Sequence, residues 1–156
     1  MAARVIIRPL REEDCAALPA ACFPETPADD VAARLADELA AQAAGEGLTL
    51  VAEEGGRVGA AMTLQVRGGG AWVHNVAAHP DFRGRGIIQR MFKRLLKEAR
   101  ARGLTRLSLH VRRDNLPAVR AYERAGFRYA GEDGMRGEQL RYERRLRPAS
   151  RGNVGS

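Results

Sequence analysis

Residues 79–92 read HPDFRGRGIIQRMF, and residues 114–127 read DNLPAVRAYERAGF. In the first segment a glycine-rich turn comes directly before apolar residues spaced three and four apart, which predicts a turn that opens a long helix. The second segment starts with residues that favour helix caps and carries Tyr122 two helical turns after Asn115. We expect the rest of the chain to be the scaffold around these two helices.

The composition indicates one soluble globular domain. The chain has 156 residues, 45% of them hydrophobic and 29% charged, and a net charge of +7. This length suits a single core, and we predict a domain over residues 1–146 followed by a flexible tail over residues 147–156. The positive charge is spread along the chain, so we do not expect nucleic acid as the main partner. Without a membrane-spanning run or a signal peptide, we expect a cytoplasmic protein with no membrane partner.

The order of the expected elements is that of an α+β domain. A short strand ending at Pro9 precedes a short helix, and a longer helix follows, with Thr26 as its cap and Pro27 in its first position. Three antiparallel strands come next, joined by a tight EEGG hairpin and a slightly longer RGGG hairpin. The long helix is expected from Arg83, and further strands are expected at residues 104–112 and 139–146 on either side of the short helix.

The glycine turn has the physical properties of an anion site. The first N–H groups of a helix have no partner within it, and Gly84 and Gly86 let the backbone approach a phosphate closely. Arg83 and Arg85 add positive charge. Gln89 stands where a dinucleotide-binding fingerprint needs glycine, and no Lys-Ser/Thr follows as in a nucleotide-binding P-loop. A plain glycine-rich turn is the alternative.

Asn115 and Tyr122 allow two interpretations. With the small Ala118 between them on one helix face, they could line a ligand channel. Equally, Asn115 could be only a helix cap and Tyr122 only a core residue.

Together, these two segments at this spacing resemble the core of the GNAT superfamily of N-acetyltransferases. The resemblance extends from IRPLREED near the N-terminus to the last strand. It implies a single GNAT-like α+β domain with a curved, mixed, mainly antiparallel sheet of six to seven strands and about four helices. Strands four and five would splay apart to admit acetyl-CoA. Family members often pair through sheet edges, so a homodimer is also allowed.

The resemblance implies a cofactor site made by three segments. Backbone groups of the fourth strand would pair with the pantetheine arm, the glycine turn would hold the pyrophosphate, and the second helix would contact the arm and the thioester sulfur. The residues are, in that order, Val76, Ala77 and Ala78; Arg83, Gly84, Arg85, Gly86, Ile87, Ile88 and Gln89; and Asn115 and Tyr122. Two positions depart from the family pattern: Ile88 stands where Gly or Ala is usual, and His110 stands where enzymes that acetylate protein N-termini commonly have Glu.

The chemistry of acetyl transfer needs a base and an acid. An amine with a pKa of about 10.4 must lose its proton before it attacks a thioester. His110 and His74 lie on neighbouring strands and are candidate bases, with a water chain or a remote Glu as the alternative. Tyr122 is the candidate acid for the departing thiolate, and the N–H of Val76 or Ala77 could bond the carbonyl oxygen. Cys15 and Cys22 lie outside these segments, so we expect no acetyl-cysteine step. They also lack the Cys-x-x-Cys or Cys/His spacing of a metal site, so we expect no metal.

The leading hypothesis is therefore an N-acetyltransferase that moves an acetyl group from acetyl-CoA to a primary amine of a small molecule, protein or peptide, by direct attack in a ternary complex. A non-catalytic acyl-CoA sensor is the first alternative, motivated by Ile88 and the missing Glu. A basic nucleic-acid or ribosome-associated module is the second. The acceptor amine stays open, because variable segments would form its pocket.

Overall fold

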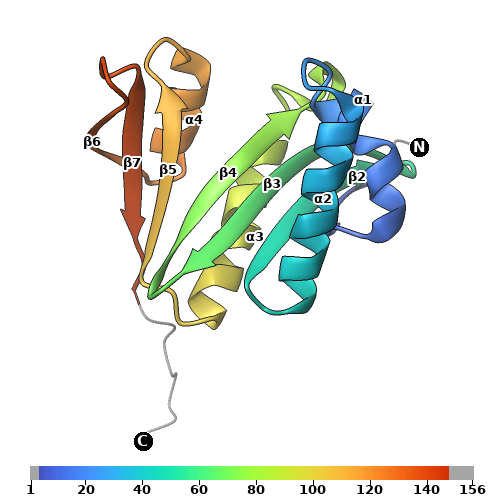
Figure 1. The fold of residues 1–156 in the computed structure, drawn as a ribbon, viewed down its shortest axis with the longest axis horizontal. Coiled ribbons are helices and arrows are strands. Elements are labelled where there is room, and N and C mark those ends of the chain that lie inside the picture. The colour runs from blue at the N-terminus through green and yellow to red at the C-terminus, as the bar shows by residue number, and fades with distance from the viewer. Residues whose placement is uncertain (1–3, 148–156) are drawn as a thin grey trace, which may run out of the picture.

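Seven strands form one mixed sheet in the order β1-β2-β3-β4-β5-β7-β6, shown in Figure 1 by a computed structural model that describes residues 4–147. Only β4 and β5 are parallel, and every other neighbouring pair is antiparallel. The strands are β1 (Val5–Pro9), β2 (Gly47–Glu54), β3 (Arg57–Arg67), β4 (Gly70–Ala78), β5 (Arg106–Arg112), β6 (Arg128–Asp133) and β7 (Gln139–Arg145). The predicted sheet of six to seven strands is confirmed.

Four α-helices cover the two faces of the sheet. They are α1 (Leu18–Cys22), α2 (Ala28–Ala43), α3 (Ile87–Ala101) and α4 (Leu116–Arg124), and two short 3-10 helices are η1 (Glu12–Ala16) and η2 (Pro80–Phe82). The apolar stripe of α3, including Met91 and Leu95, packs on one face together with Tyr122 of α4. Val31 and Leu35 of α2 pack with α1 on the other face. Within the described residues, no helix is both long and apolar enough to cross a membrane.

The parallel strands β4 and β5 form a fork. They pair only from Gly70 to Trp72 of β4, with residues 106–108 of β5, and then diverge, as Figure 1 shows. Beyond the pairing, β4 carries a bulge: Ala61 of β3 faces Ala77 and Thr63 faces His74, so two residues of β4 oppose one of β3. Such a bulge bends its strand and re-aims side chains. Here it turns the end of β4 away from β5.

Three local predictions are wrong in detail, each because of backbone conformation. The long helix begins at Ile87 instead of Arg83, since Gly84 and Gly86 have φ of 70° and 74°, which a right-handed helix excludes. Pro27 is the N-cap of α2 and no side chain caps this helix, so Thr26 does not. The RGGG hairpin is a two-residue turn, because Gly70 already pairs with Arg67.

The predicted boundary at residue 146 stays a prediction. Apart from Arg147, the tail predicted over residues 147–156 lies outside the described residues.

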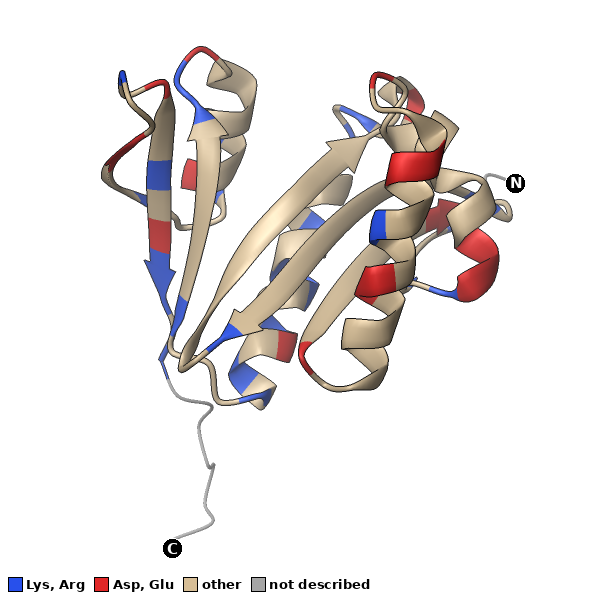
Figure 2. Ribbon diagram, viewed as in Figure 1, with Lys and Arg blue, Asp and Glu red and all other residues tan. Residues whose placement is uncertain are grey.

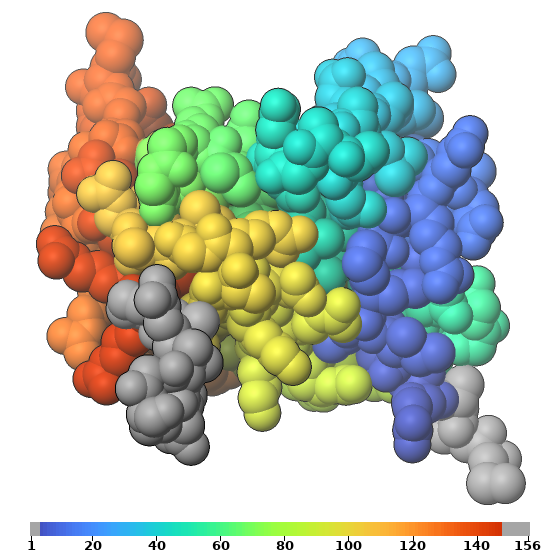
Figure 3. Space-filling model, turned by 90° about the horizontal axis from the view of Figure 1, so that it is seen from below, coloured from blue at the N-terminus to red at the C-terminus, as the bar shows by residue number. Residues whose placement is uncertain are grey.

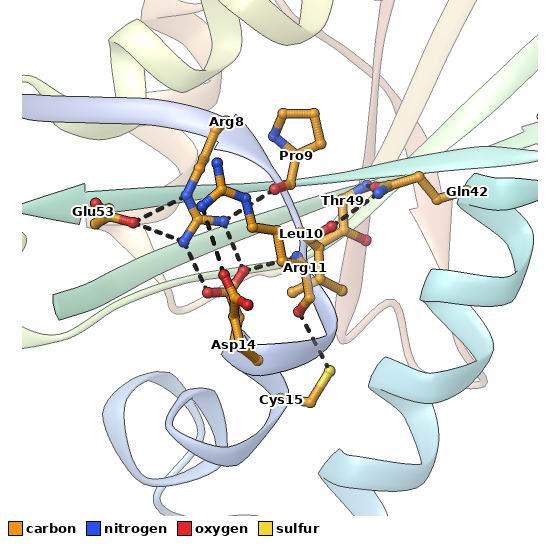
Figure 4. Close-up of polar contacts among 10 residues, drawn as sticks. Arg8, Pro9, Leu10, Arg11, Asp14, Cys15, Gln42, Thr49 and Glu53 are labelled. Carbon is orange, nitrogen blue, oxygen red and sulfur yellow. Dashed lines mark hydrogen bonds and ion pairs between the residues drawn. The ribbon is translucent and has the colours of Figure 1, made fainter. Parts of the chain in front are cut away.

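A buried ion cluster fixes the N-terminal segment to the sheet (Figure 4). The Arg8 guanidinium, on β1, donates from Nη1 and Nη2 to the two Asp14 carboxylate oxygens, both at 2.8 Å, and from Nη2 to Glu53 Oε1 of β2 at 2.8 Å. Arg8 is 9% exposed and Asp14 4% exposed. Although burial raises the pKa of Asp14, hydrogen bonds from Arg8 and the Arg11 N–H outweigh it and hold that pKa below its ordinary value of 3.8. The cluster thereby sets where η1 leaves the sheet.

We predict that Asp14→Asn lowers the free energy of unfolding by about 3 kcal/mol at neutral pH, because the buried Arg8 charge loses the carboxylate that accepts two of its hydrogen bonds and keeps only Glu53 as an ionic partner. A depressed carboxyl pKa stabilises the fold above the unfolded-state pKa and is lost as the pH falls through the folded-state pKa. The difference from wild type should therefore shrink below pH 3.8. Urea unfolding at several pH values measures it. Glu13→Gln, at a side chain 73% exposed in the same segment, is the control and should change stability by less than about 0.5 kcal/mol; equal losses would contradict the prediction.

Candidate active site

The glycine turn is anchored by a buried aromatic ring. Phe82, 2% exposed, packs against β3 where Gly59 has no side chain; a Cβ there would lie 2.1 Å from the ring. The chain then passes through Gly84 and Gly86, both left-handed, and enters α3 without a side-chain cap. Arg90 is the first residue whose N–H bonds back, to Gly86 O at 3.1 Å. The N–H groups at the start of α3 are thus free of helical partners.

A cavity of about 630 Å³ lies at this turn, and we call it the turn cavity. It brings together all but one of the residues predicted to bind the cofactor. These are Val76, Ala77, Ala78, Arg83, Gly84, Gly86, Ile87, Ile88, Gln89, Asn115 and Tyr122. Arg85 does not line it, because its guanidinium donates to Glu54 at 2.5 Å and to Asp81 O at 3.1 Å.

Side chains from α3 and α4 shape the turn cavity. Gln89 donates from Nε2 to Ala121 O at 3.0 Å and so ties α3 to α4. Asn115 is the N-cap of α4, and its Oδ1 accepts from the Ala118 N–H at 3.3 Å. Both interpretations of Asn115 therefore hold in part: it caps a helix, and it also lines a cavity. Ile88 is half-buried against the core beside the turn.

Tyr122 stands between the turn cavity and a second one. The second, of about 510 Å³, lies in the opening between β4 and β5, and we call it the fork cavity; it shares Val76 and Tyr122 with the turn cavity. The Tyr122 ring packs edge-on against Phe92 at 5.8 Å between centroids. Burial raises the pKa of the phenol above 10.0, so it stays protonated at neutral pH. Its hydroxyl makes no hydrogen bond with the described residues. Tyr122 is therefore both a core residue and part of the lining of the two cavities.

His110 lines the fork cavity from β5 and is oriented by a carboxylate. Its Nε2 lies 2.6 Å from Asp133 Oδ2, and its ring lies 4.7 Å from the Trp72 ring, centroid to centroid. A carboxylate only accepts, so Nε2 carries a proton toward Asp133. In the neutral ring Nδ1 then keeps its lone pair. This is the arrangement of a base and the group that orients it.

His74 differs from His110 in the partner of its ring nitrogen, because a donor and not an acceptor faces it. Asn75 Nδ2 donates both to Glu38 Oε1, at 3.1 Å, and to His74 Nδ1, at 2.8 Å. A neutral His74 must therefore carry its proton on Nε2, which is buried without a partner among residues 4–147. Burial lowers the pKa of His74 below 6.5, with Glu38 acting in the opposite direction. In this geometry the neutral His74 ring presents an N–H at Nε2.

Four residues at this site escaped prediction from the sequence. Glu38 of α2 is nearly buried and accepts from Thr49, Thr63 and Asn75. Asp133 and Trp72 hold the His110 ring. The only hint in the sequence for Glu38 is a charge on the inner flank of an amphipathic helix, and Asp133 looks like any solvated loop charge. Asn75 has φ of 56°, unusual for a residue with a side chain, and nothing in a strand pattern signals it.

The cysteines stand apart from both cavities. Neither Cys15 nor Cys22 lines them, and burial raises the pKa of Cys22 to about 11. Among residues 4–147, no group of three or more His, Cys, Asp or Glu side chains is placed to hold a metal ion.

The model of the acetyltransferase (GNAT) family matches residues 9–127. The chain belongs to this family. Membership supports acetyl transfer as the activity, with acetyl-CoA as the donor, and leaves the acceptor unspecified. The family predicted from the sequence is confirmed.

Several solved structures share the fold. The PaiA N-acetyltransferase from Thermoplasma acidophilum, in complex with coenzyme A, is 17% identical with a TM-score of 0.81 over 92% of this chain and 99% of that one. YncA from Salmonella typhimurium, with its cofactor acetyl-CoA, is 23% identical with a TM-score of 0.75 over 94% and 96%. The ribosomal-protein-S18-alanine N-acetyltransferase from Escherichia coli is 21% identical with a TM-score of 0.70 over 97% and 98%. At these identities the likeness establishes the fold.

The turn cavity fits the phosphates of a coenzyme A derivative. The start of α3 is uncapped, and a Cβ at Gly84 or Gly86 would meet nothing within 4 Å, so the backbone there is open to a ligand. Arg83 and Arg124 add positive charge to the lining. Uncapped N–H groups at the positive end of a helix dipole are the preferred environment of a phosphate.

We predict that His74 titrates below pH 6.5 and that Glu38→Gln lowers its pKa further, because the carboxylate that favours the imidazolium is gone. NMR titration of the three histidine rings measures both values. Asp37→Asn, which removes the same charge from the exposed neighbouring residue of α2, is the control and should leave His74 unchanged. A His74 pKa that does not fall in Glu38→Gln would refute the chain of contacts through Asn75.

Proposed function

We propose that this protein is an N-acetyltransferase that moves an acetyl group from acetyl-CoA to a primary amine, of a small molecule or of a protein or peptide, by direct attack in a ternary complex. One observation carries the proposal: the turn cavity and the fork cavity meet at Val76 and Tyr122, so donor and acceptor can approach from opposite sides. The free thiols of Cys15 and Cys22 suit the cytoplasmic location that we propose with it.

On the donor side, the chain supplies binding and orientation. We assign the phosphates to the N–H groups at the start of α3 and to Arg83, and the pantetheine arm to the backbone of residues 76–78 beside Asn115. Bound acetyl-CoA supplies an activated thioester carbonyl and, after transfer, a thiolate. The N–H of Val76 or Ala77 is our candidate donor to the carbonyl oxygen, where negative charge develops.

On the acceptor side, His110 is the proposed base. Its Nδ1 lone pair can take a proton from the amine, while Asp133 holds the ring and stabilises the imidazolium that forms. His74 is instead assigned to donating from Nε2 to an oxygen of the acceptor, since Asn75 already occupies its Nδ1. Tyr122 is the proposed acid, because its raised pKa keeps the phenol protonated until a thiolate takes the proton.

We expect acetyl-CoA to raise the melting temperature and the protein to release free thiol from it when an accepted amine is present. Tyr122→Phe should keep the melting shift and lose roughly 100-fold in turnover, because the proton donor is removed while the ring stays. Tyr129→Phe, at an exposed tyrosine of β6, is the matched control.

The same measurements separate the alternatives. A melting shift without thiol release on any amine would favour an acyl-CoA sensor, and no shift at all would defeat the proposed donor site. Equal losses of binding and turnover in Tyr122→Phe would make Tyr122 structural.

The base assignment predicts an order among histidine variants. His110→Gln should lower turnover by about 100-fold with the acetyl-CoA affinity unchanged, and Asp133→Asn should cause a smaller loss, because it removes only the orienting group. His74→Gln should act mainly on the KM for the amine. Steady-state kinetics over amine concentration, with acetyl-CoA saturating, checks this order. If His74→Gln abolished turnover and His110→Gln did not, the two roles would have to be exchanged.

A further inference from the structure

Three arginines stand in one row at the closed end of the fork. Arg67 of β3 pairs with Gly70 of β4, Gly70 with Arg106 of β5, and Arg106 with Arg145 of β7. Residues in register on neighbouring strands point to the same face of a sheet. Figure 2 shows the positive residues gathered at these lower strand ends. Like charges opposite each other destabilise a strand pair, so this row opposes the stability of the fold.

No carboxylate of residues 4–147 pairs with these three guanidinium groups. Glu143, the nearest acidic residue along β7, lies 3.7 Å from Arg141 Nε, and Asp133 is taken up by His110 and Arg141. Residues 147–156 contain no acidic side chain. Among residues 4–147, the positive charge of the row is therefore left without a carboxylate partner.

The row lines a hollow that leads to the reacting groups. A cavity of about 540 Å³, which we call the end cavity, is lined by Arg67, Gly70, Arg106 and Arg145. A Cβ at Gly70 would lie 3.0 Å from Arg106 O, so the glycine lets β4 and β5 approach closely within the row. Arg67 also lines the fork cavity, which reaches Tyr122. Figure 3 looks onto this end, where the β3–β4 turn, the segment entering β5 and the end of β7 lie close together.

The distance between the row and the reacting groups decides the size of the acceptor. Val76, which lines both the turn cavity and the fork cavity, stands six residues beyond Gly70 on β4. At about 3.3 Å per residue this separation is close to 20 Å, and about 13 Å if the long Arg67 side chain reaches inward. A free amino acid is too short to span it. An extended peptide covers it in about four to six residues.

We infer, on the basis of the proposed acetyl transfer, that Arg67, Arg106 and Arg145 bind carboxylates of an acidic peptide acceptor, about four to six residues from the amine that is acetylated. A hydrogen-bond donor also lines the path between the arginines and the reacting amine, since His74 presents a buried Nε2–H without a partner in the described part of the chain. An acidic peptide is favoured over nucleic acid because the end cavity is joined through Arg67 to the cavity that ends at Tyr122. The end cavity thus selects the acceptor peptide by its negative charge, at a distance from the amine that reacts.

The test compares two peptides of equal length with a free N-terminal amine, one with Asp and Glu at positions four to six and one with Asn and Gln there. We expect kcat/KM to favour the acidic peptide by about tenfold, and this preference to weaken at high salt. Arg106→Gln should reduce the preference by about threefold, and the variant with all three arginines changed to Gln should lose it. Arg4→Gln, which removes one charge beside the far edge strand, is the control. The row variants should melt no lower than wild type, because they relieve repulsion.

A binding measurement separates this inference from the proposed function. Fluorescence anisotropy with the acidic peptide, labelled at its C-terminus and already acetylated at its amine, reports binding without turnover. The site is supported if the affinity falls in the triple variant and not in Arg4→Gln. Equal use or equal binding of the neutral peptide would overturn the acidic-acceptor inference while acetyl transfer stands. Tighter binding of single-stranded RNA, competing with the peptide, would overturn it in favour of nucleic acid.

Discussion

The separation of β4 from β5 is the constraint on which the whole site depends. Among the described strands these two are the only parallel pair, and they share just three residue pairs before they diverge. Hydrogen-bonded strands have no room for a ligand between them, so the cavities exist because pairing stops at Trp72. The bulge at Asn75 lies just beyond this point, and its left-handed backbone bends the end of β4. Glu38, reaching across from α2, holds the Asn75 amide in place.

The fork also separates two kinds of chemistry. On one side, the uncapped start of α3 and the glycine turn offer N–H groups and a positive dipole end. On the other side, each histidine is fixed in a different state by its neighbour: Asp133 accepts from His110, and Asn75 donates to His74. His110 and His74 are the same residue type in the sequence, yet we assign the first as a proton acceptor and the second as a hydrogen-bond donor. Tyr122, buried among aromatic rings, stands where the two sides meet.

Most elements of the fold follow from local patterns in the sequence. The apolar spacing of α3, the paired glycines of the β2–β3 hairpin and the cap at Asn115 each depend on residues close together in the chain, and each is found as predicted. The predictions failed where backbone conformation overrides pattern. Arg83 to Gly86 resembles the start of a helix by composition, but two left-handed glycines keep these residues in a turn. Arg85 stays a predicted phosphate-binding residue; it pairs with Glu54 of a distant hairpin, a contact that no local pattern signals.

The sequence by itself determined the family, the glycine turn, and the positions of Asn115 and Tyr122, because these depend on spacing within one helix or one turn. Only the tertiary structure decided which groups face one another across strands. The contacts of Glu38 with Asn75, of Asp133 with His110, and the row formed by Arg67, Arg106 and Arg145 join residues that are far apart in the chain. Strand register sets the arginine row and the contact of Asp133 with His110, and the packing of α2 on the sheet sets the contact of Glu38 with Asn75; both are properties of the assembled fold.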